Sequence, residues 1–439
     1  MTARDVAARV LVRVDRERAF AAAALEAELG REPDLDARDR ALATELVYGT
    51  LRVAPWLEEQ IGRHASRGTS KLDPRVRALL TVAAYQLFFM RVPAFAAVNE
   101  AVQAVRDARG PKVAAFANAV LRRVAEQAAA TRSESEDRVL LETAVVASTP
   151  AWLRESLARA LGDDGARAFL RAGVEAPAAA LRIEHAIEPA GERESRRTEW
   201  IARLREAAPG ASFEPGRASP LAILVRGAGK PQRLPGWSEG AWSIQEEGSQ
   251  VAALALEAQP GETVLDACAG RGNKTSLLAR AVAPEGAVDA CDSSPSKLER
   301  LDEELARVGL APRATYAVDW GVGSGEVAGQ YDAVLVDAPC SGVGTLRRRP
   351  EIGLRREADD LASLAAAQLA IARRAATHVR PGGRFVYVVC SVLREECEAV
   401  VEAFLEASPE FFSHDGSFRR LLPHVDGTDG YFVAKLARR

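Results

Sequence analysis

Hydrophobic positions in the first part of the chain recur every three to four residues, which is the spacing of amphipathic helices. Val6 and Val10 show this period, and the run "FANAVLRRV" shows it again further along. Pro55 and Pro93 fall between periodic segments, where proline can end one helix and open the next. Residues 1–130 are therefore predicted to form an all-helical bundle.

A polar stretch, "AAATRSESEDR", follows this bundle and is nearly free of large apolar residues, so residues 131–148 are predicted to be a linker. Beyond it, Thr149 stands where a helix N-cap is expected and Pro150 where the first helical residue is expected. The strand-like runs "AALRIE" and "LAILVR" then flank the helical run "RTEWIARLREA". This order predicts a small α+β segment over residues 149–238.

The last part of the chain alternates short apolar runs with longer helical patterns from Gly261 onward. The strand-like runs are "ETVLDACA", "GAVDACD", "ATYAVD", "YDAVLVDAP", "GRFVYVVC" and, last, "DGYFVAKLAR". Such alternation is typical of a parallel sheet with helices on both faces. Residues 239–439 are therefore predicted to form an α/β, doubly wound, Rossmann-like domain.

The composition is that of a globular protein, since 48% of the 439 residues are hydrophobic and 27% are charged. No apolar stretch approaches the roughly 20 residues that a membrane-spanning helix needs, and the first residues lack the pattern of a signal peptide. Five cysteines without a CxxC pair, with only five histidines, argue against a disulfide framework and a zinc site. We expect a cytoplasmic monomer without a metal or a membrane partner.

The charge of the chain is informative only locally. The formal net charge of -3 gives no global sign of a nucleic-acid partner, which usually shows as a basic domain. The run "TLRRRPEIGLRR", Thr345–Arg356, is nevertheless a concentrated basic loop. Two interpretations of this loop stay open: contact with nucleic-acid phosphate, and a solvated charged loop without a partner.

Acidic residues close four successive strand-like runs, at the edge where open α/β sheets bind ligands. They are Asp266, Asp292, Asp319 and Asp337. After the first of them, Gly270 and Gly272 precede a helix, where backbone amides can approach a ligand closely because no Cβ intervenes. Four carboxylates would repel phosphate, whereas they suit a nucleoside with a cationic centre. The pattern favours S-adenosylmethionine over NAD or ATP as the cofactor.

Cys340 and Cys390 follow two of the apolar runs, so both thiols are expected at the carboxyl edge of one sheet. Methylation of carbon 5 of a pyrimidine needs a thiol, because a thiolate that adds at carbon 6 makes carbon 5 nucleophilic. A second group then removes the carbon 5 proton. Asp337 is a candidate for holding N3 of the base, and the charge of Lys274 would favour a thiolate. The other interpretation is that both cysteines are small buried residues at strand ends.

Several motifs together resemble those of a known family. The runs "DAPCSGVGTLRRRPE", "VVCSVLREECE", "VLDACAGRGNKT", "SIQEEGSQ" and "GTDGYFVAKL" resemble the motifs of RNA cytosine-5 methyltransferases, the Sun/Fmu (RsmB-like) group in particular. The runs "LATELVYGTLR", "VPAFAAVNEAV" and "FANAVLRRV" resemble the NusB-like RNA-binding domain that this group carries in front. The resemblance covers nearly the whole chain.

The resemblance implies a role for each matching residue. Cys390 would be the nucleophile at carbon 6, Cys340 would assist release of the product, and Asp337 would hold the base. The residues implied in binding S-adenosylmethionine are Cys268, Ala269, Gly270, Arg271, Gly272, Asn273, Lys274, Asp292, Asp319 and Asp337. The implied substrate is a cytidine in small-subunit (16S) ribosomal RNA, which residues 149–238 would help to contact.

Other residues bear on contact with RNA and on two rival functions. Arg182, Glu184 and the arginines of the basic loop are candidates for RNA contact. Arg271 and Asn273 stand where the family usually has Pro and Gly. These departures support a rival function, a non-catalytic RNA-binding or ribosome-assembly factor that keeps the fold. A transfer-RNA cytosine-5 methyltransferase, the third alternative, would share every catalytic residue.

Overall fold

The computed structural model describes residues 2–65, 68–131, 137–184, 190–413 and 416–439. The chain divides into two compact units, each with its own core. The first unit comprises Met1–Glu155, Asp163–Glu175 and Leu346–Arg356, and the second comprises Ser156–Gly162, Ala176–Thr345 and Glu357–Arg439. Within the described ranges, we find no helix that combines the length and apolar character needed to cross a lipid bilayer.

The first unit is helical, as the hydrophobic period predicts. Its helices are α1 Ala3–Arg16, α2 Ala21–Gly30, α3 Ala37–Gly62, α4 Pro74–Phe89, α5 Ala94–Arg109, α6 Pro111–Thr131, α7 Asp137–Ser148, parts of α8 Ala151–Ala172, and α13 Glu351–Arg355. Val6 and Val10 are fully buried, which confirms the apolar stripe of α1. Pro55 lies just after a kink at Val53, whose non-helical backbone divides α3 into two helical segments, as the sequence predicts. Pro93 does precede a helix, at the N-cap of α5.

The structure corrects the predicted linker, whose residues 132–136 lie outside the described part of the chain. Residues 137–148 form helix α7, and the buried Val145 on this helix belongs to the core of the first unit. The Trp56 backbone N–H donates to the Ser148 hydroxyl at 3.2 Å. The Thr149 hydroxyl donates back to the Val145 carbonyl at 2.9 Å, so Thr149 follows α7 rather than capping α8. Pro150 itself is the N-cap of α8.

The second unit begins with a small antiparallel sheet in the order β2-β3-β1-β4. Its strands are β1 Ala179–Ile183, β2 Ser212–Pro215, β3 Ala222–Arg226 and β4 Trp242–Ile244, and helix α9 Ala190–Ala207 packs against it. The predicted strands correspond to β1 and β3, whereas β2 and β4 were not predicted. Trp242 is fully buried in the core between this sheet and α9, so the segment has a hydrophobic core of its own.

A large mixed sheet forms the rest of the second unit, in the order β10-β12-β9-β8-β5-β6-β7, with β11 paired to β12. Its strands are β5 Thr263–Asp266, β6 Ala287–Asp292, β7 Ala314–Ala317, β8 Tyr331–Asp337, β9 Val379–Val389, β10 Phe411–Phe412, β11 Phe418–Leu421 and β12 Tyr431–Arg438. The five strands β5 to β9 pair in parallel, which confirms the predicted doubly wound core. The last strand departs from the predicted parallel pattern, because β12 runs antiparallel to β9.

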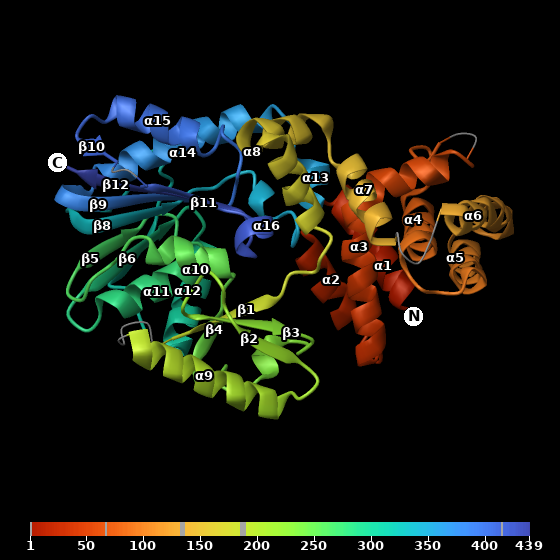
Figure 1. Cartoon of the computed structure of the whole chain (residues 1–439), viewed down its shortest axis with the longest axis horizontal. Helices are drawn as coiled ribbons and strands as arrows, with labels where there is room; N and C mark the ends of the chain where they lie inside the picture. Colours follow the sequence, from red (N-terminus) through yellow and green to blue (C-terminus); the bar gives the residue numbers. More distant parts are fainter. Residues whose placement is uncertain (1, 66–67, 132–136, 185–189, 414–415) are drawn as a thin grey trace. The chain divides into compact units, whose positions relative to one another are not determined.

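Helices cover both faces of the large sheet (Figure 1). Helices α14 Asp360–Ala376 and α15 Glu398–Ala407 pack on one face, and α10 Glu247–Leu254, α11 Asn273–Val282 and α12 Pro295–Arg307 pack on the other. The remaining elements are the 3₁₀ turns η1 Pro231–Arg233 and η2 Val343–Thr345 and the short helix α16 Pro423–Asp426. The two layers of helices leave β8 and β9 buried on both faces, at the centre of the sheet.

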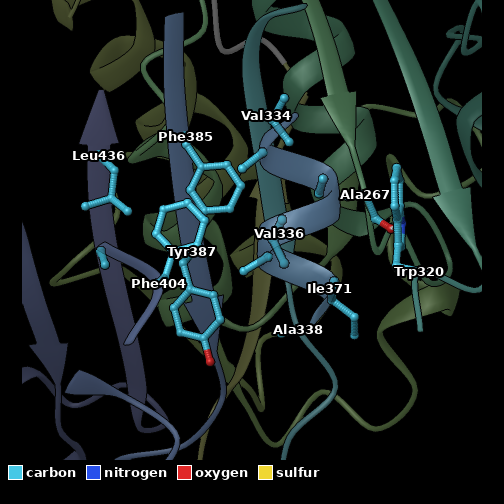
Figure 2. Packing of buried hydrophobic residues seen from close by; sticks show 14 of the residues in the cluster. Ala267, Trp320, Val334, Val336, Ala338, Ile371, Phe385, Tyr387, Phe404 and Leu436 are labelled. Atoms are coloured by element: carbon cyan, nitrogen blue, oxygen red, sulfur yellow. The ribbon is translucent and has the colours of Figure 1, made fainter. Parts of the chain in front are cut away.

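Aromatic side chains fill the core between the sheet and helices α14 and α15 (Figure 2). Phe385 of β9 stacks on Phe404 of α15, with ring centroids 5.2 Å apart and an interplanar angle of 7°. The indole N–H of Trp320 donates to the Ala267 carbonyl at 2.7 Å. Each large apolar side chain buried in this way contributes about 1.5–3 kcal/mol. This packing holds β8 and β9 in fixed register, and both strands lead into the candidate site.

Candidate active site

The carboxyl ends of β8 and β9 bring two sulfur atoms together. Cys340 follows β8 and Cys390 follows β9, and these two strands are parallel neighbours. The Sγ atoms lie 3.3 Å apart, which is hydrogen-bonding contact and well beyond the roughly 2.05 Å of a disulfide. Both residues are half-buried. The structure thus brings the two predicted thiols into direct contact.

The two thiols differ in their surroundings. The hydrogen bond to Cys390, followed by burial, raises the pKa of the Cys340 thiol well above its ordinary value. Cys340 therefore keeps its proton at neutral pH, and the 3.3 Å contact allows it to donate that proton to the Cys390 sulfur.

A buried cation lies in the same cluster. Lys274, in the first turn of α11, is only 8% exposed, and its Nζ lies 2.5 Å from Oδ2 of Asp337. Burial lowers the pKa of Lys274, but attraction to Asp337, Asp266 and Cys390 outweighs this effect and raises it overall. Lys274 is therefore charged, and its charge supports negative charge on nearby groups. The Asp337 side chain is more exposed, at 29%, and remains accessible to a ligand.

Asp266, at the end of β5, lies deeper than these residues. Its carboxylate is fully buried and accepts from the Thr275 hydroxyl at 2.8 Å. Burial raises the pKa of Asp266 to about 6. Burial and then the charge of Asp266 also raise the pKa of the Cys268 thiol, so Cys268 is protonated at neutral pH. These two residues form the floor of the site rather than its reactive surface.

A buried carboxylate that the sequence reasoning did not single out ties the two cysteine loops together. Glu396 is fully buried and accepts from the backbone N–H of Ser341 at 2.7 Å and from the Ser391 hydroxyl at 2.6 Å. It also accepts from the Ser341 hydroxyl at 2.5 Å and from the Gln368 amide at 3.0 Å. Ser341 and Ser391 each directly follow one of the cysteines. The repeated "CS" in "DAPCSG" and "VVCSV" is the sequence signal that could have indicated such a shared acceptor.

The glycine-containing loop between β5 and α11 leaves room for a ligand. In the described part of the chain, no atom lies within 4 Å of a Cβ built at Gly270, whereas a Cβ at Gly272 would meet Leu301 at 2.8 Å. Both glycines have positive φ, which disfavours other residues. Arg271 and Asn273 are exposed, so their side chains do not fill the interior of the loop. The residues present therefore fit a nucleoside cofactor that approaches the backbone beside Gly270.

The acidic residues lie along four adjacent strands, as predicted, but they are not equivalent. Asp292 is 7% exposed and accepts from the Gly270 backbone N–H at 3.1 Å and from Lys297 at 3.1 Å. It therefore shapes the glycine loop. Asp319 is exposed and lies two residues beyond β7, where it accepts from the Gly321 N–H at 2.8 Å. It does not close the strand itself, which corrects the prediction for that residue.

The structure also corrects the assignment of Arg182 and Glu184 to an RNA-contacting surface. Both residues are buried, at 1% and 2% exposure, and they pair with each other. The Arg182 guanidinium donates to the Gln245 amide oxygen, to the backbone carbonyl of Asn273 and to the Ser276 hydroxyl, each at 2.5 Å. Arg182 thus joins the small sheet to the first turn of α11, immediately beside Lys274.

Comparison with known proteins decides the family. The family described as 16S rRNA methyltransferase RsmB/F matches residues 253–437, and the NusB family matches residues 1–126. The chain is 32% identical to the probable ribosomal RNA small subunit methyltransferase B of Bacillus subtilis, over 99% of this chain and 98% of that relative. It is 33% identical to ribosomal RNA small subunit methyltransferase B of Pseudomonas putida, over 100% and 99% of the two chains. This chain belongs to the ribosomal RNA small subunit methyltransferase B family.

Solved structures share the fold of this family member. The crystal structure of PH0851 matches with a TM-score of 0.80 and 23% identity, over 99% of both chains. NSun6 from Pyrococcus horikoshii matches with a TM-score of 0.56 and 18% identity, over 66% of this chain and 98% of that one. The NSun6 structure contains SFG, an analogue of S-adenosylmethionine. Members of the methyltransferase B family are S-adenosylmethionine-dependent methyltransferases of small-subunit ribosomal RNA.

Proposed function

We propose that this protein methylates carbon 5 of a cytidine in small-subunit (16S) ribosomal RNA through a covalent adduct between Cys390 and carbon 6. The observation that carries the proposal is the 3.3 Å contact between the Cys340 and Cys390 sulfurs, beside the Lys274–Asp337 ion pair. The thiolate is the reactive form of a cysteine, and the protonated Cys340 thiol and the charged Lys274 both interact with Cys390.

The proposed reaction starts with attack of the Cys390 sulfur on carbon 6 of the base. A C–S bond forms, and the electron pair of the 5,6 double bond becomes available at carbon 5. Asp337 holds the base, since its carboxylate can accept a hydrogen bond from the exocyclic amino group of cytosine. S-adenosylmethionine, when bound, supplies the electrophilic methyl group. We assign its binding to residues Cys268–Lys274 with Asp292, Asp319 and Asp337.

Release of the product reverses the addition. The carbon 5 proton leaves to a base, the 5,6 double bond forms again, and the Cys390 thiolate is expelled. We assign Cys340 to this step as a hydrogen-bond donor to the departing sulfur, because its protonated thiol lies 3.3 Å from the sulfur of Cys390. Lys274 stabilises the thiolate that is expelled, as it does the thiolate that attacks.

The proposed mechanism predicts that replacing one cysteine prevents the covalent adduct, whereas replacing the other makes it accumulate. Cys390→Ala should reduce methyl transfer to 16S ribosomal RNA below detection, because no covalent adduct forms. Cys340→Ala should accumulate RNA bound covalently through Cys390, visible as a band that survives denaturing gel electrophoresis. Cys291→Ala, at a cysteine buried in β6, is the control and should retain activity. Full activity of Cys390→Ala would show that the proposed mechanism is wrong.

Two other experiments separate the rival functions. A non-catalytic assembly factor would bind RNA without S-adenosylmethionine, so calorimetry with this cofactor distinguishes it. The exposure of Arg271 and Asn273 weakens the case for this rival, because neither side chain obstructs the loop. A transfer-RNA substrate would use the same residues, so methylated cytidines must be mapped in RNA from cells with and without the protein. We expect the missing methyl group in small-subunit ribosomal RNA.

A further inference from the structure

An exposed aromatic ring in the first unit is surrounded by arginines. Phe20, between α1 and α2, is 57% exposed. The guanidinium of Arg355 lies 5.4 Å from the centroid of its ring, and that of Arg349 lies 5.9 Å from it. Both arginines come from the basic loop that the sequence indicates, and both belong to the first unit together with Phe20. We call the turn 17–20 and residues 346–356 together the Phe20 surface.

Hydrogen bonds hold the two segments of the Phe20 surface to each other. Glu351 is 1% exposed and accepts from the backbone N–H of Ala21 at 3.1 Å. The Arg18 guanidinium donates to the Arg355 carbonyl at 3.2 Å, and the Arg355 guanidinium donates to the Ala19 carbonyl. These bonds join residues more than three hundred positions apart in the sequence, so the arrangement of Phe20 and the arginines is fixed by the fold.

A cavity of about 280 Å³ adjoins this surface and lies between α1, α3, α4 and the end of α13. Arg18, Leu354 and Arg355 line it, so it is continuous with the Phe20 surface. Thr50 also lines it, and this fully buried hydroxyl has no hydrogen-bond partner among the described residues. The cavity is close in size to small ligand pockets, and its lining mixes apolar side chains such as Leu11 and Leu51 with charged ones such as Arg18 and Arg355.

The charge around the Phe20 surface is positive. The neighbouring acids are already paired, since Glu17 lies 3.1 Å from Arg13 and Asp15 lies 2.7 Å from Arg77. Arg18 and Arg349 remain exposed. Arginines interleaved with an exposed aromatic ring are the pattern by which proteins bind single-stranded RNA, because bases stack on the ring and guanidiniums hold phosphates.

We propose that the Phe20 surface binds an unpaired nucleotide of the RNA substrate, apart from the cytidine that reacts. The base stacks on Phe20, and Arg18 and Arg349 hold the flanking phosphates. The inference rests on the proposed function only in that the substrate is RNA. An acidic peptide would pair with the arginines but would leave the exposed ring without a role, so the combination favours RNA.

The test compares two exposed phenylalanines of the same unit in the full-length protein. Phe20→Ala should weaken binding of transcribed, unmodified 16S ribosomal RNA by about tenfold, since stacking of one base accounts for roughly that factor. Phe20→Trp should retain the affinity. Phe95→Ala is the matched control, because Phe95 is 71% exposed at the start of α5, and it should bind as the wild type does. Arg349→Gln should reduce the salt dependence of binding by about one phosphate contact.

The outcomes separate this inference from the proposed function. Phe20→Ala should raise the KM for RNA and leave kcat at saturating RNA unchanged, and circular dichroism should show that it is folded. If Phe20→Ala binds RNA as tightly as Phe95→Ala does, the surface is not an RNA site, and a protein partner becomes the better interpretation. Failure of the cysteine mechanism would appear only in the Cys390 and Cys340 variants, since RNA affinity does not depend on methyl transfer.

Discussion

A single buried carboxylate connects the two loops that carry the neighbouring sulfurs of Cys340 and Cys390. Glu396 accepts hydrogen bonds from Ser341 and Ser391, so the residues that follow Cys340 and Cys390 share one acceptor. Hydrogen bonds to a charged acceptor are roughly twice as strong as neutral ones. The two loops leave different strands, and this shared anchor helps the strand register and the hydrogen bond from the Gly344 N–H to the Cys390 carbonyl to keep the two cysteines at contact distance.

Replacing Glu396 should therefore impair catalysis without removing a reacting group. Glu396→Gln keeps the size of the side chain but replaces one acceptor oxygen with an NH2 donor, so the residue can no longer accept from all of its present donors on Ser341, Ser391 and Gln368. We expect kcat to fall at least tenfold while the Kd for S-adenosylmethionine stays within about twofold, with a stability loss of about 1.5–3 kcal/mol. Glu395→Gln, at the adjacent residue that pairs with Arg159 nearer the surface, is the control. Equal kcat values for the two variants would exclude this positioning role.

Asp266 makes the stability of the second unit depend on pH in an unusual direction. Its pKa is raised by burial from 3.8 to about 6 in the folded protein. The folded state therefore holds a proton that the unfolded state releases between these values, and stability is lost as the pH rises through about 6. A carboxylate paired with a cation usually has a lowered pKa, so its contribution to stability is instead lost as the pH falls.

The Asp266→Asn variant tests this dependence, because asparagine is neutral at every pH. Relative to this variant, the wild type should lose about 2 kcal/mol of unfolding free energy between pH 4 and pH 7. Urea denaturation at several pH values measures the difference. Asp302→Asn, at an exposed position of α12, should show no such trend relative to the wild type. A flat difference for Asp266→Asn would mean that its carboxyl group is ionised at low pH.

At the scale of elements, Arg182 connects β1 to the start of α11. Its planar guanidinium serves Gln245, Asn273 and Ser276 at once, which a lysine ammonium cannot do with the same geometry. Arg182→Lys should therefore loosen the first turn of α11, which carries Lys274 and follows the glycine loop. We expect the Kd for S-adenosylmethionine to rise about tenfold by calorimetry, while RNA affinity is unchanged. Arg226→Lys, on an exposed part of β3, is the control.

Elements with strong patterns were predictable from the sequence, and elements defined by their neighbours were not. Valine-rich runs such as β8 are buried on both faces, and this burial is visible in their composition. Strands β2 and β4 are four and three residues long, too short for any period to appear. Helix α7 follows a polar stretch, and its buried Val145 indicates a helix only once its neighbours are known.

The residues of the candidate site likewise fall into those that the sequence predicts and those that only the structure reveals. Cys340, Cys390, Lys274 and Asp337 stand at strand and helix ends, and the parallel topology alone predicts that they meet. Glu396 and Arg182 act through partners that lie up to 94 positions away in the sequence. Nothing in a single sequence reports such pairs, and for Arg182 the sequence suggested exposure where the structure shows burial.

At the scale of the whole molecule, the chain enters and leaves each unit more than once. Residues Leu346–Arg356 belong to the first unit, whereas the residues on both sides of them belong to the second. Glu351 belongs to the first unit and accepts the backbone N–H of Ala21 at the start of α2 at 3.1 Å. The first unit therefore includes a segment that follows the N-terminal helices by more than 150 residues in the sequence.

This interleaving has a consequence for how the protein is made. Leu346 leaves the ribosome about 170 residues after Glu175, a delay of about 10–30 s at ordinary rates of bacterial translation. During that interval the N-terminal helices exist without α13, and the turn around Phe20 lacks its hydrogen bonds to Glu351 and Arg355. A nascent chain that stalls before residue 346 would display an unfinished helical unit, and completion of the fold would coincide with synthesis of the sheet that carries the two thiols.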